Sequence, residues 1–175
     1  IKKLSKKELK YFRIMRTTSG VLYITSKPGI AKSSISKSIA NKLDMEYFDL
    51  RLSMLDETDV GLFPKVIETT EGSFLDHVVP LWAHKANQQP TIIHFEELNR
   101  APLSVRNAAL QILLERTIGT KFKFNDNVLF IASGNLGSED GTDVEEFDTA
   151  LDNRLIHIKH TLSLDEWIDN YANEN

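Results

Sequence analysis

A lysine followed by a serine is the residue pair in this sequence best suited to hold phosphate groups and a metal ion. Lys32 and Ser33 end a loop that follows the apolar run Val21–Thr25, and a helix-like pattern comes after them. In such a loop, backbone N–H groups surround phosphates, the lysine reaches the terminal phosphates and the hydroxyl binds Mg²⁺. The sequence therefore predicts a nucleotide-binding loop made of Ser26, Lys27, Pro28, Gly29, Ile30, Ala31, Lys32, Ser33 and Ser34.

Two positions of this loop depart from the common phosphate-binding pattern G-x-x-x-x-G-K-[ST]. Ser26 and Ala31 replace the two glycines, so the pattern by itself does not identify the site. The change at Ser26 matters only where the backbone needs a positive φ, which glycine adopts without strain. We expect phosphate binding to survive it.

Two glutamates end the apolar run Thr91–Phe95. At the end of a buried strand, Glu96 and Glu97 could hold Mg²⁺ through water and polarise an attacking water molecule. The alternative is that both carboxylates are simply solvated where the strand meets the surface. The phosphate-binding loop upstream favours the first interpretation.

An asparagine and an arginine stand at the borders of two later strand-like runs. Asn135 follows Val128–Ser133 and Gly134, and an amide at the carboxyl end of a strand can hydrogen-bond a γ-phosphate or the attacking water. Gly-Asn is also an ordinary turn, so this signal is weak alone. Arg154, directly before the last run, is either a surface salt-bridge partner or an arginine that reaches a nucleotide.

Strand-like and helix-like segments alternate along the chain. Continuous apolar runs predict parallel strands that are buried on both faces. The runs are Val21–Thr25, Tyr47–Leu52, Thr91–Phe95, Val128–Ser133 and Leu155–Ile158. Helical apolar stripes follow the loop and span residues 104–116, where Pro102 suits the helix start and Ser104 could cap it. This order predicts an α/β fold with right-handed crossovers.

Two segments interrupt the simple alternation. Residues 51–90 are far longer than a usual connection and are predicted to be an insertion. Residues 117–127 contain Gly119 and the alternating stretch Lys121–Phe124, which predicts a β-hairpin with one apolar face.

The composition is that of a single soluble domain. The chain has 175 residues, of which 41% are hydrophobic and 26% charged, and no apolar stretch approaches the roughly 18 residues of a membrane span. The absence of cysteine excludes disulfides, and we expect a cytoplasmic location. The net charge of −4 gives no general attraction to nucleic acid, so the lysines near the amino terminus are interpreted as a solvated helix face. His94, inside a strand-like run, is expected to be structural.

Residues Glu96–Pro102 resemble the D-E-[IL]-N-R-A-P signature of the MoxR-like ATPases, in the dynein-related group of AAA+ modules. The match is long and specific. Other parts of the chain resemble the same family, from its phosphate loop to the start of its helical lid. These parts are 28–33, Asp49–Leu52, Asp59–Pro64, Ala150–His157 and Leu164–Trp167.

The resemblance implies an AAA+ P-loop core at residues 1–160 and the start of a truncated helical lid at 161–175. It implies a five-stranded parallel sheet in the order 5-1-4-3-2, with the insertion after strand 2 and the hairpin before strand 4. It also implies ATP and Mg²⁺ as cofactors, bound and used by six residues. Lys32 would bind the β- and γ-phosphates, Ser33 and Glu96 would hold Mg²⁺, Glu97 would be the general base, Asn135 the sensor-1 residue, and Arg154 the residue that reaches the neighbouring subunit.

One departure from the family concerns the metal site. Glu96 stands where the family has aspartate, which moves the carboxylate by about 1.5 Å, one carbon–carbon bond, and could weaken activity.

The resemblance implies an ATP-hydrolysing ring, a hexamer, that remodels a partner protein, often one with a von Willebrand A domain. A nucleotide-binding scaffold without turnover is the first alternative. A nucleic-acid motor that grips phosphates through Lys121 and Lys123 is the second, and the net acidity argues against it. The choice between ATP and GTP stays open.

Overall fold

The computed structural model describes residues 3–17, 20–27, 32–136, 147 and 152–161. Within these residues, five parallel strands form one sheet in the order β2-β5-β8-β1-β9. The strands are β1 (Val21–Ser26), β2 (Glu46–Arg51), β5 (Thr91–Glu96), β8 (Val128–Asn135) and β9 (Leu155–Lys159). Numbered by their order along the chain, they stand as 5-1-4-3-2 when read from β9, so the α/β fold and its strand order are confirmed.

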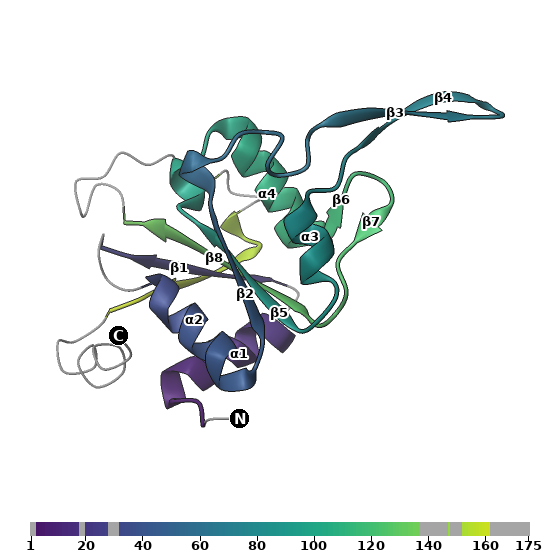
Figure 1. Cartoon of the computed structure of the whole chain (residues 1–175). Helices are drawn as coiled ribbons and strands as arrows, with labels where there is room; N and C mark the ends of the chain where they lie inside the picture. The colour runs from purple at the N-terminus through teal and green to yellow at the C-terminus, as the bar shows by residue number, and fades with distance from the viewer. Residues whose placement is uncertain (1–2, 18–19, 28–31, 137–146, 148–151, 162–175) are drawn as a thin grey trace.

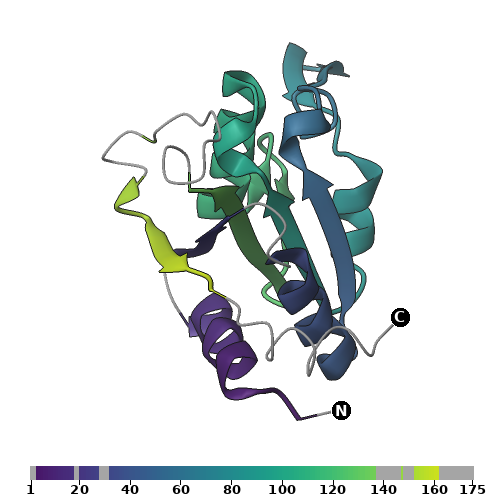
Figure 2. The same cartoon turned by 90° about the vertical axis from the view of Figure 1, so that its left-hand side faces the viewer.

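Helices cover both faces of the sheet (Figure 1, Figure 2). One face packs against α1 (Lys6–Thr17) and α2 (Lys32–Leu43), and the other against α3 (Leu81–Ala86) and α4 (Leu103–Glu115). Successive strand residues point to opposite faces, so Leu22 packs with α1 and α2 while Tyr23 packs with α4. Every residue of β5 and β8 is buried, as their continuous apolar runs predict.

Helix α4 carries the predicted apolar stripe, but its predicted cap is wrong. The helix begins at Leu103, and Pro102 occupies the N-cap position with extended backbone angles and no side-chain cap hydrogen bond. Ser104 already lies inside the first helical turn. Its hydroxyl therefore cannot take the place of a residue that precedes the helix.

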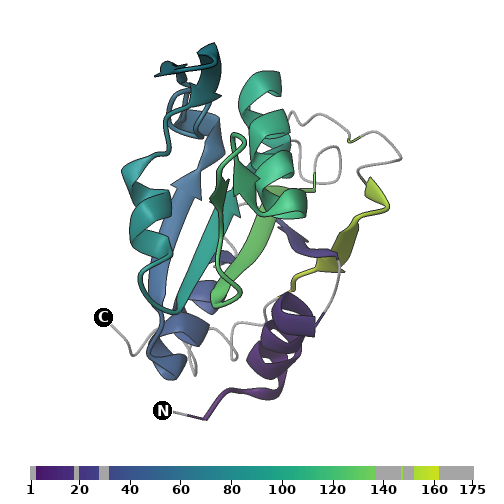
Figure 3. The same cartoon turned by 90° about the vertical axis from the view of Figure 1, so that its right-hand side faces the viewer.

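The predicted insertion, residues 51–90, holds a short 3₁₀ turn, η1 (Leu52–Met54), a hairpin of β3 (Pro64–Thr69) and β4 (Gly72–His77), and helix α3. The β3–β4 hairpin extends away from the body of the molecule (Figure 1). The hairpin predicted at residues 117–127 is confirmed as β6 (Thr117–Ile118) and β7 (Phe122–Lys123). Figure 3 shows it beside α3 and α4, on the face of the sheet opposite α1.

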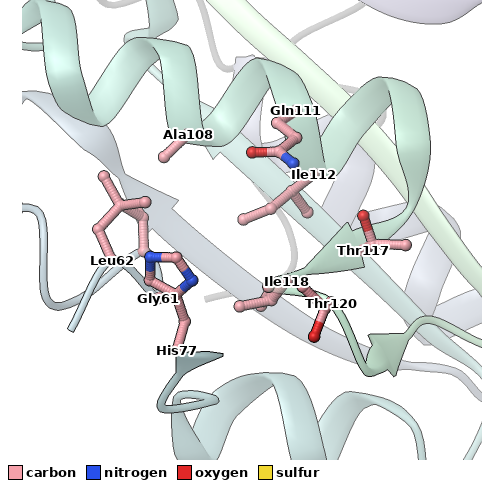
Figure 4. A pocket seen from close by; sticks show the side chains of 11 residues that line it. Gly61, Leu62, His77, Ala108, Gln111, Ile112, Thr117, Ile118 and Thr120 are labelled. Atoms are coloured by element: carbon pink, nitrogen blue, oxygen red, sulfur yellow. The ribbon is translucent and has the colours of Figure 1, made fainter. Parts of the chain in front are cut away.

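The two hairpins are joined at a small pocket of about 190 Å³ (Figure 4). Asp76 of β4 accepts hydrogen bonds from the backbone N–H of Thr120 at 3.2 Å and from its hydroxyl at 2.9 Å. Gly61 and Gly119, both with positive φ, bring the chain close to Ile118 and Asp76 at this point. The insertion is therefore anchored to the β6–β7 turn and not only to the strands on either side of it.

Most of the predicted lid, residues 162–175, and the acidic stretch 139–146 lie outside the described residues. Among the helices that the structure describes, none is both long enough and apolar enough to cross a membrane.

Candidate active site

Three predicted residues meet where β1 and β8 end and α2 begins. The Lys32 ammonium donates a hydrogen bond to Asn135 Oδ1 at 2.9 Å and another to the carbonyl oxygen of Ser26 at 3.4 Å. Neighbouring parallel strands end at the same edge of a sheet, which is why residues 103 positions apart come together. Of the predicted loop, Ser26 is buried, Lys27 is exposed, Ser34 is half-buried, and residues 28–31 lie outside the described part.

The second group at this edge surrounds the carboxyl group of Glu96. The Ser33 hydroxyl donates a hydrogen bond to Glu96 Oε1, and Arg51 Nε lies 3.5 Å from Oε2. Asp49, also on β2, shares a hydrogen bond with Glu96. Burial and the neighbouring charge of Glu96 raise the pKa of Asp49 to about 6, although Arg51 and Lys37 act against the rise. Two carboxyl groups that lie this close together give this end of the sheet an acidic character.

The oxygen atoms around Glu96 fit a hard divalent cation. Mg²⁺ prefers oxygen ligands and usually keeps several waters, with one or two carboxylates and phosphate oxygens completing its shell. Ser33 and Glu96 supply a hydroxyl and a carboxylate, and Asp49 supplies a second carboxyl. Among the described residues no group of three or more His, Cys, Asp or Glu side chains could hold a metal, so an ion here would depend on nucleotide and water for most of its ligands.

Glu97 directly follows β5 but turns away from this group. Its backbone is left-handed, with φ 57° and ψ 37°, and its carboxylate accepts a hydrogen bond from the Ser53 hydroxyl of η1. Arg100 Nη1 lies 3.9 Å from the same oxygen. In this state the predicted general base is therefore held by two other side chains. Sequence reasoning missed Ser53, and its place just after the strand next to β5 was the available signal.

Asn99 is a second residue that the sequence analysis did not assign. It lies in the 3₁₀ turn η2 (Leu98–Arg100), and its side chain forms two hydrogen bonds with the backbone of Asn135. Its place in the motif Glu96–Pro102 is the sequence feature that could have identified it as a residue of the site.

His94 is fully buried in β5, two residues before Glu96. Its Nε2 is 2.9 Å from the Ser133 hydroxyl and its Nδ1 is 3.1 Å from the Tyr47 hydroxyl. Burial lowers the pKa of His94 to about 4, although the charge of Glu96 acts in the other direction. The imidazole is therefore neutral near pH 7 and links three neighbouring strands, which agrees with the structural role expected for it.

Arg154 is not brought to this edge. It is exposed and directly precedes β9, and its carbonyl oxygen accepts a hydrogen bond from Val21 N at the first residue of β1. Ser26 ends β1 five residues later, so about 17 Å separate the two ends of the strand. Arg154 lies at the amino end of the sheet and is poorly placed to reach the Lys32 site of its own chain.

The helix that follows β1 begins with Lys32 and Ser33, and the carboxylate of Glu96 at the end of β5 lies beside them. Together with the phosphate-loop sequence that precedes Lys32, this arrangement is typical of the P-loop class of nucleotide-binding domains. Residues 22–160 match the model of the "ATPase family associated with various cellular activities (AAA)". The chain belongs to this family. A search of curated protein sequences found no significant match.

Solved structures support the fold. A protein described as a candidate ATPase, from Cytophaga hutchinsonii ATCC 33406, is 17% identical with a TM-score of 0.61, over 97% of this chain and 50% of that one. NtrX from Brucella abortus, in complex with ATP, is 16% identical with a TM-score of 0.52, over 90% of this chain and 36% of that one. Its ADP complex is 18% identical with a TM-score of 0.54, over 87% and 34%. The chain therefore spans half or less of these neighbours.

Proposed function

We propose that the chain binds ATP together with Mg²⁺ and hydrolyses it. The observation that carries this proposal is that an ammonium, a hydroxyl, a carboxylate and an amide meet at one edge of the sheet: Lys32, Ser33, Glu96 and Asn135. Membership of the AAA family supports nucleotide binding. The similarity to NtrX structures that contain ATP or ADP is in keeping with it.

In this proposal each side chain has a separate task. Lys32 contacts the β- and γ-phosphates, while Ser33 and Glu96 hold Mg²⁺, which when bound neutralises charge on the phosphate oxygens. Asn135 orients the γ-phosphate or the attacking water. As the water oxygen attacks the γ-phosphorus and the bond to the β-phosphate oxygen breaks, Glu97 accepts the proton of the water.

The test is calorimetry with ATP, GTP and ADP, each with Mg²⁺ and with a chelator. Binding of ATP should be stronger with Mg²⁺, and this dependence should fall in Glu96→Gln because one metal-side carboxylate is lost. Glu115→Gln, an exposed glutamate on α4, is the matched control and should behave as the parent. The absence of binding heat with all three nucleotides would refute the proposal, and the comparison also decides between ATP and GTP.

A nucleotide-binding scaffold without turnover is the second candidate. It is favoured by the contacts that hold Glu97 to Ser53 and Arg100, and by glutamate in place of aspartate at position 96. Measured phosphate release separates the two candidates. Binding without release from an assembled ring would select the scaffold.

We also propose that the complete protein is a MoxR-type ring, a hexamer, in which Arg154 serves the site of the neighbouring subunit. The exposed position of Arg154 at the amino end of the sheet supports a role between subunits. The partner in this proposal is a protein to be remodelled, with a von Willebrand A domain as the first to test. Lys121 and Lys123 are exposed, so a salt-dependent DNA titration tests the alternative nucleic-acid motor.

A further inference from the structure

We propose that Asn99 is a positioning residue that fixes Asn135 and ties it to the turn that carries Glu97. This inference rests on the proposed function, because it assigns Asn135 to the γ-phosphate and Glu97 to the attacking water. Its geometric part, the attachment of Asn99 to β8, can be tested without nucleotide.

The attachment consists of two reciprocal hydrogen bonds. Asn99 Nδ2 donates to the carbonyl oxygen of Asn135 at 2.9 Å, and the N–H of Asn135 donates to Asn99 Oδ1 at 3.2 Å. A carboxamide can donate and accept at once, which neither a carboxylate nor an aliphatic side chain of the same size can do. The side chain of Asn99 is buried, so loss of these bonds would leave backbone groups of Asn135 without their partner and shielded from water.

The side chain of Asn99 lies directly against the backbone of β8 at Gly134. A Cβ atom on Gly134 would stand 2.8 Å from Asn99 Cγ and would also collide with the Tyr23 hydroxyl. Gly134 therefore allows the amide plane of Asn99 to lie against the strand. The side chain of the next residue, Asn135, points to the Lys32 ammonium at 2.9 Å.

Glu97 directly precedes the 3₁₀ turn η2, which contains Asn99. Only one residue separates Glu97 from Asn99, and the N–H of Arg100 donates to the carbonyl oxygen of Glu97 at 2.9 Å, which closes the turn. Leu98 between them is completely buried. Because the turn is short and anchored, this one amide side chain links the turn that follows β5 to the end of β8, beyond the last paired residues Phe95 and Ala132. In the proposed reaction these ends carry the two groups on either side of the attacking water.

The test compares nucleotides with and without the γ-phosphate. Calorimetry would measure the dissociation constants of ADP and of ATPγS, with Mg²⁺, for the parent, Asn99→Leu and Asn135→Ala. Asn99→Leu should weaken the binding of ATPγS by about tenfold more than that of ADP, and Asn135→Ala should do the same, since one hydrogen bond to a charged group is misplaced or lost. The double variant should be no weaker than Asn135→Ala alone. Asn107→Leu, at an exposed position of α4, is the matched control.

A purely structural role of Asn99 would weaken ADP and ATPγS equally, and that result would overturn the inference. Asn99→Asp replaces Asn99→Leu if the latter does not fold, because it keeps the shape but cannot donate to the Asn135 carbonyl. Amide exchange of Asn135, followed by NMR without nucleotide, should become about fivefold faster in Asn99→Leu, which removes the acceptor of this N–H, and should stay slow in Asn99→Asp, which keeps that acceptor. Unchanged exchange in Asn99→Leu would also overturn the inference. If the parent binds no nucleotide, the proposed function fails, and the exchange rate still decides whether Asn99 fixes Asn135.

Discussion

Replacement of Lys32 by alanine is expected to weaken nucleotide binding by about two orders of magnitude. Among the described residues, the ammonium contacts Asn135 at 2.9 Å and the Ser26 carbonyl at 3.4 Å. With a triphosphate bound, it would exchange them for phosphate oxygens. Two charge-assisted hydrogen bonds stabilise by about 1.5–3 kcal/mol each, less about 1 kcal/mol for each contact given up. The net loss, with a midpoint of about 2.5 kcal/mol, corresponds to roughly 70-fold in dissociation constant.

The assay is calorimetry of ATP with Mg²⁺ for the parent and Lys32→Ala, with thermal unfolding to establish that the variant is folded. Lys85→Ala, which removes an exposed lysine on α3, controls for the loss of one positive charge and should leave the dissociation constant unchanged. A change smaller than about threefold in a folded Lys32→Ala protein would refute the reasoning. It would place the nucleotide elsewhere on the molecule.

Three further outcomes are expected. Glu97→Gln should keep ATP binding and abolish phosphate release from an assembled ring, because the general base is lost, whereas release at the parental rate would assign that role to another group. Arg154→Ala and Lys32→Ala proteins, each inactive alone, should recover turnover when mixed, since one subunit would supply the arginine and the other the loop; mixed rings without turnover, detected by native mass spectrometry, would exclude sharing. Glu8→Gln should cost about 2 kcal/mol of unfolding free energy near pH 7, measured with urea. Burial raises the pKa of Glu8, but hydrogen bonds from Lys42 and from neighbouring hydroxyl groups outweigh burial and hold that pKa below 4.5. The contribution of Glu8 to the unfolding free energy is therefore present above pH 4.5, and it is lost as the pH falls through the folded-state pKa. The variant should therefore lose stability less steeply in acid than the parent, and equal slopes would contradict this.

The central strands could be predicted because each contains a short apolar run, whereas the edge strand β2 also carries Asp49 and Arg51. Buried parallel strands need apolar side chains on both faces, and β5 and β8 show that pattern without interruption. The order of the strands across the sheet could not be read from periodicity, since an apolar run does not show which strand lies beside it, and it came from the family resemblance. The cap of α4 was misassigned because Ser104 has the chemistry of a cap, while Pro102 has the backbone angles of one.

The residues of the candidate site also fall into some that could be predicted from the sequence and some that could not. Lys32, Ser33 and Asn135 could be predicted, because strand ends of a parallel sheet meet at one edge whatever the details of packing. Ser53 and Asn99 could not, because their roles depend on contacts between segments that are distant in the chain, 44 and 36 residues apart. Serine and asparagine are common in loops, and only the observed hydrogen bonds distinguish these two.

The extra methylene of Glu96 belongs to a site that extends to the edge strand β2. In the parallel pairing of β2 with β5, Arg51 is opposite Glu96, and Asp49 is opposite His94, two residues earlier on each strand. The carboxyl group of Glu96 thus has Ser33 on one oxygen and Arg51 on the other, with Asp49 hydrogen-bonded beside them. An aspartate would retract the carboxyl group by about 1.5 Å and could not keep these contacts without movement of the backbone. Glutamate at this position therefore fits the contacts that Ser33, Asp49 and Arg51 make with it, and its difference from the aspartate of the MoxR-like signature has to be judged together with Asp49 and Arg51.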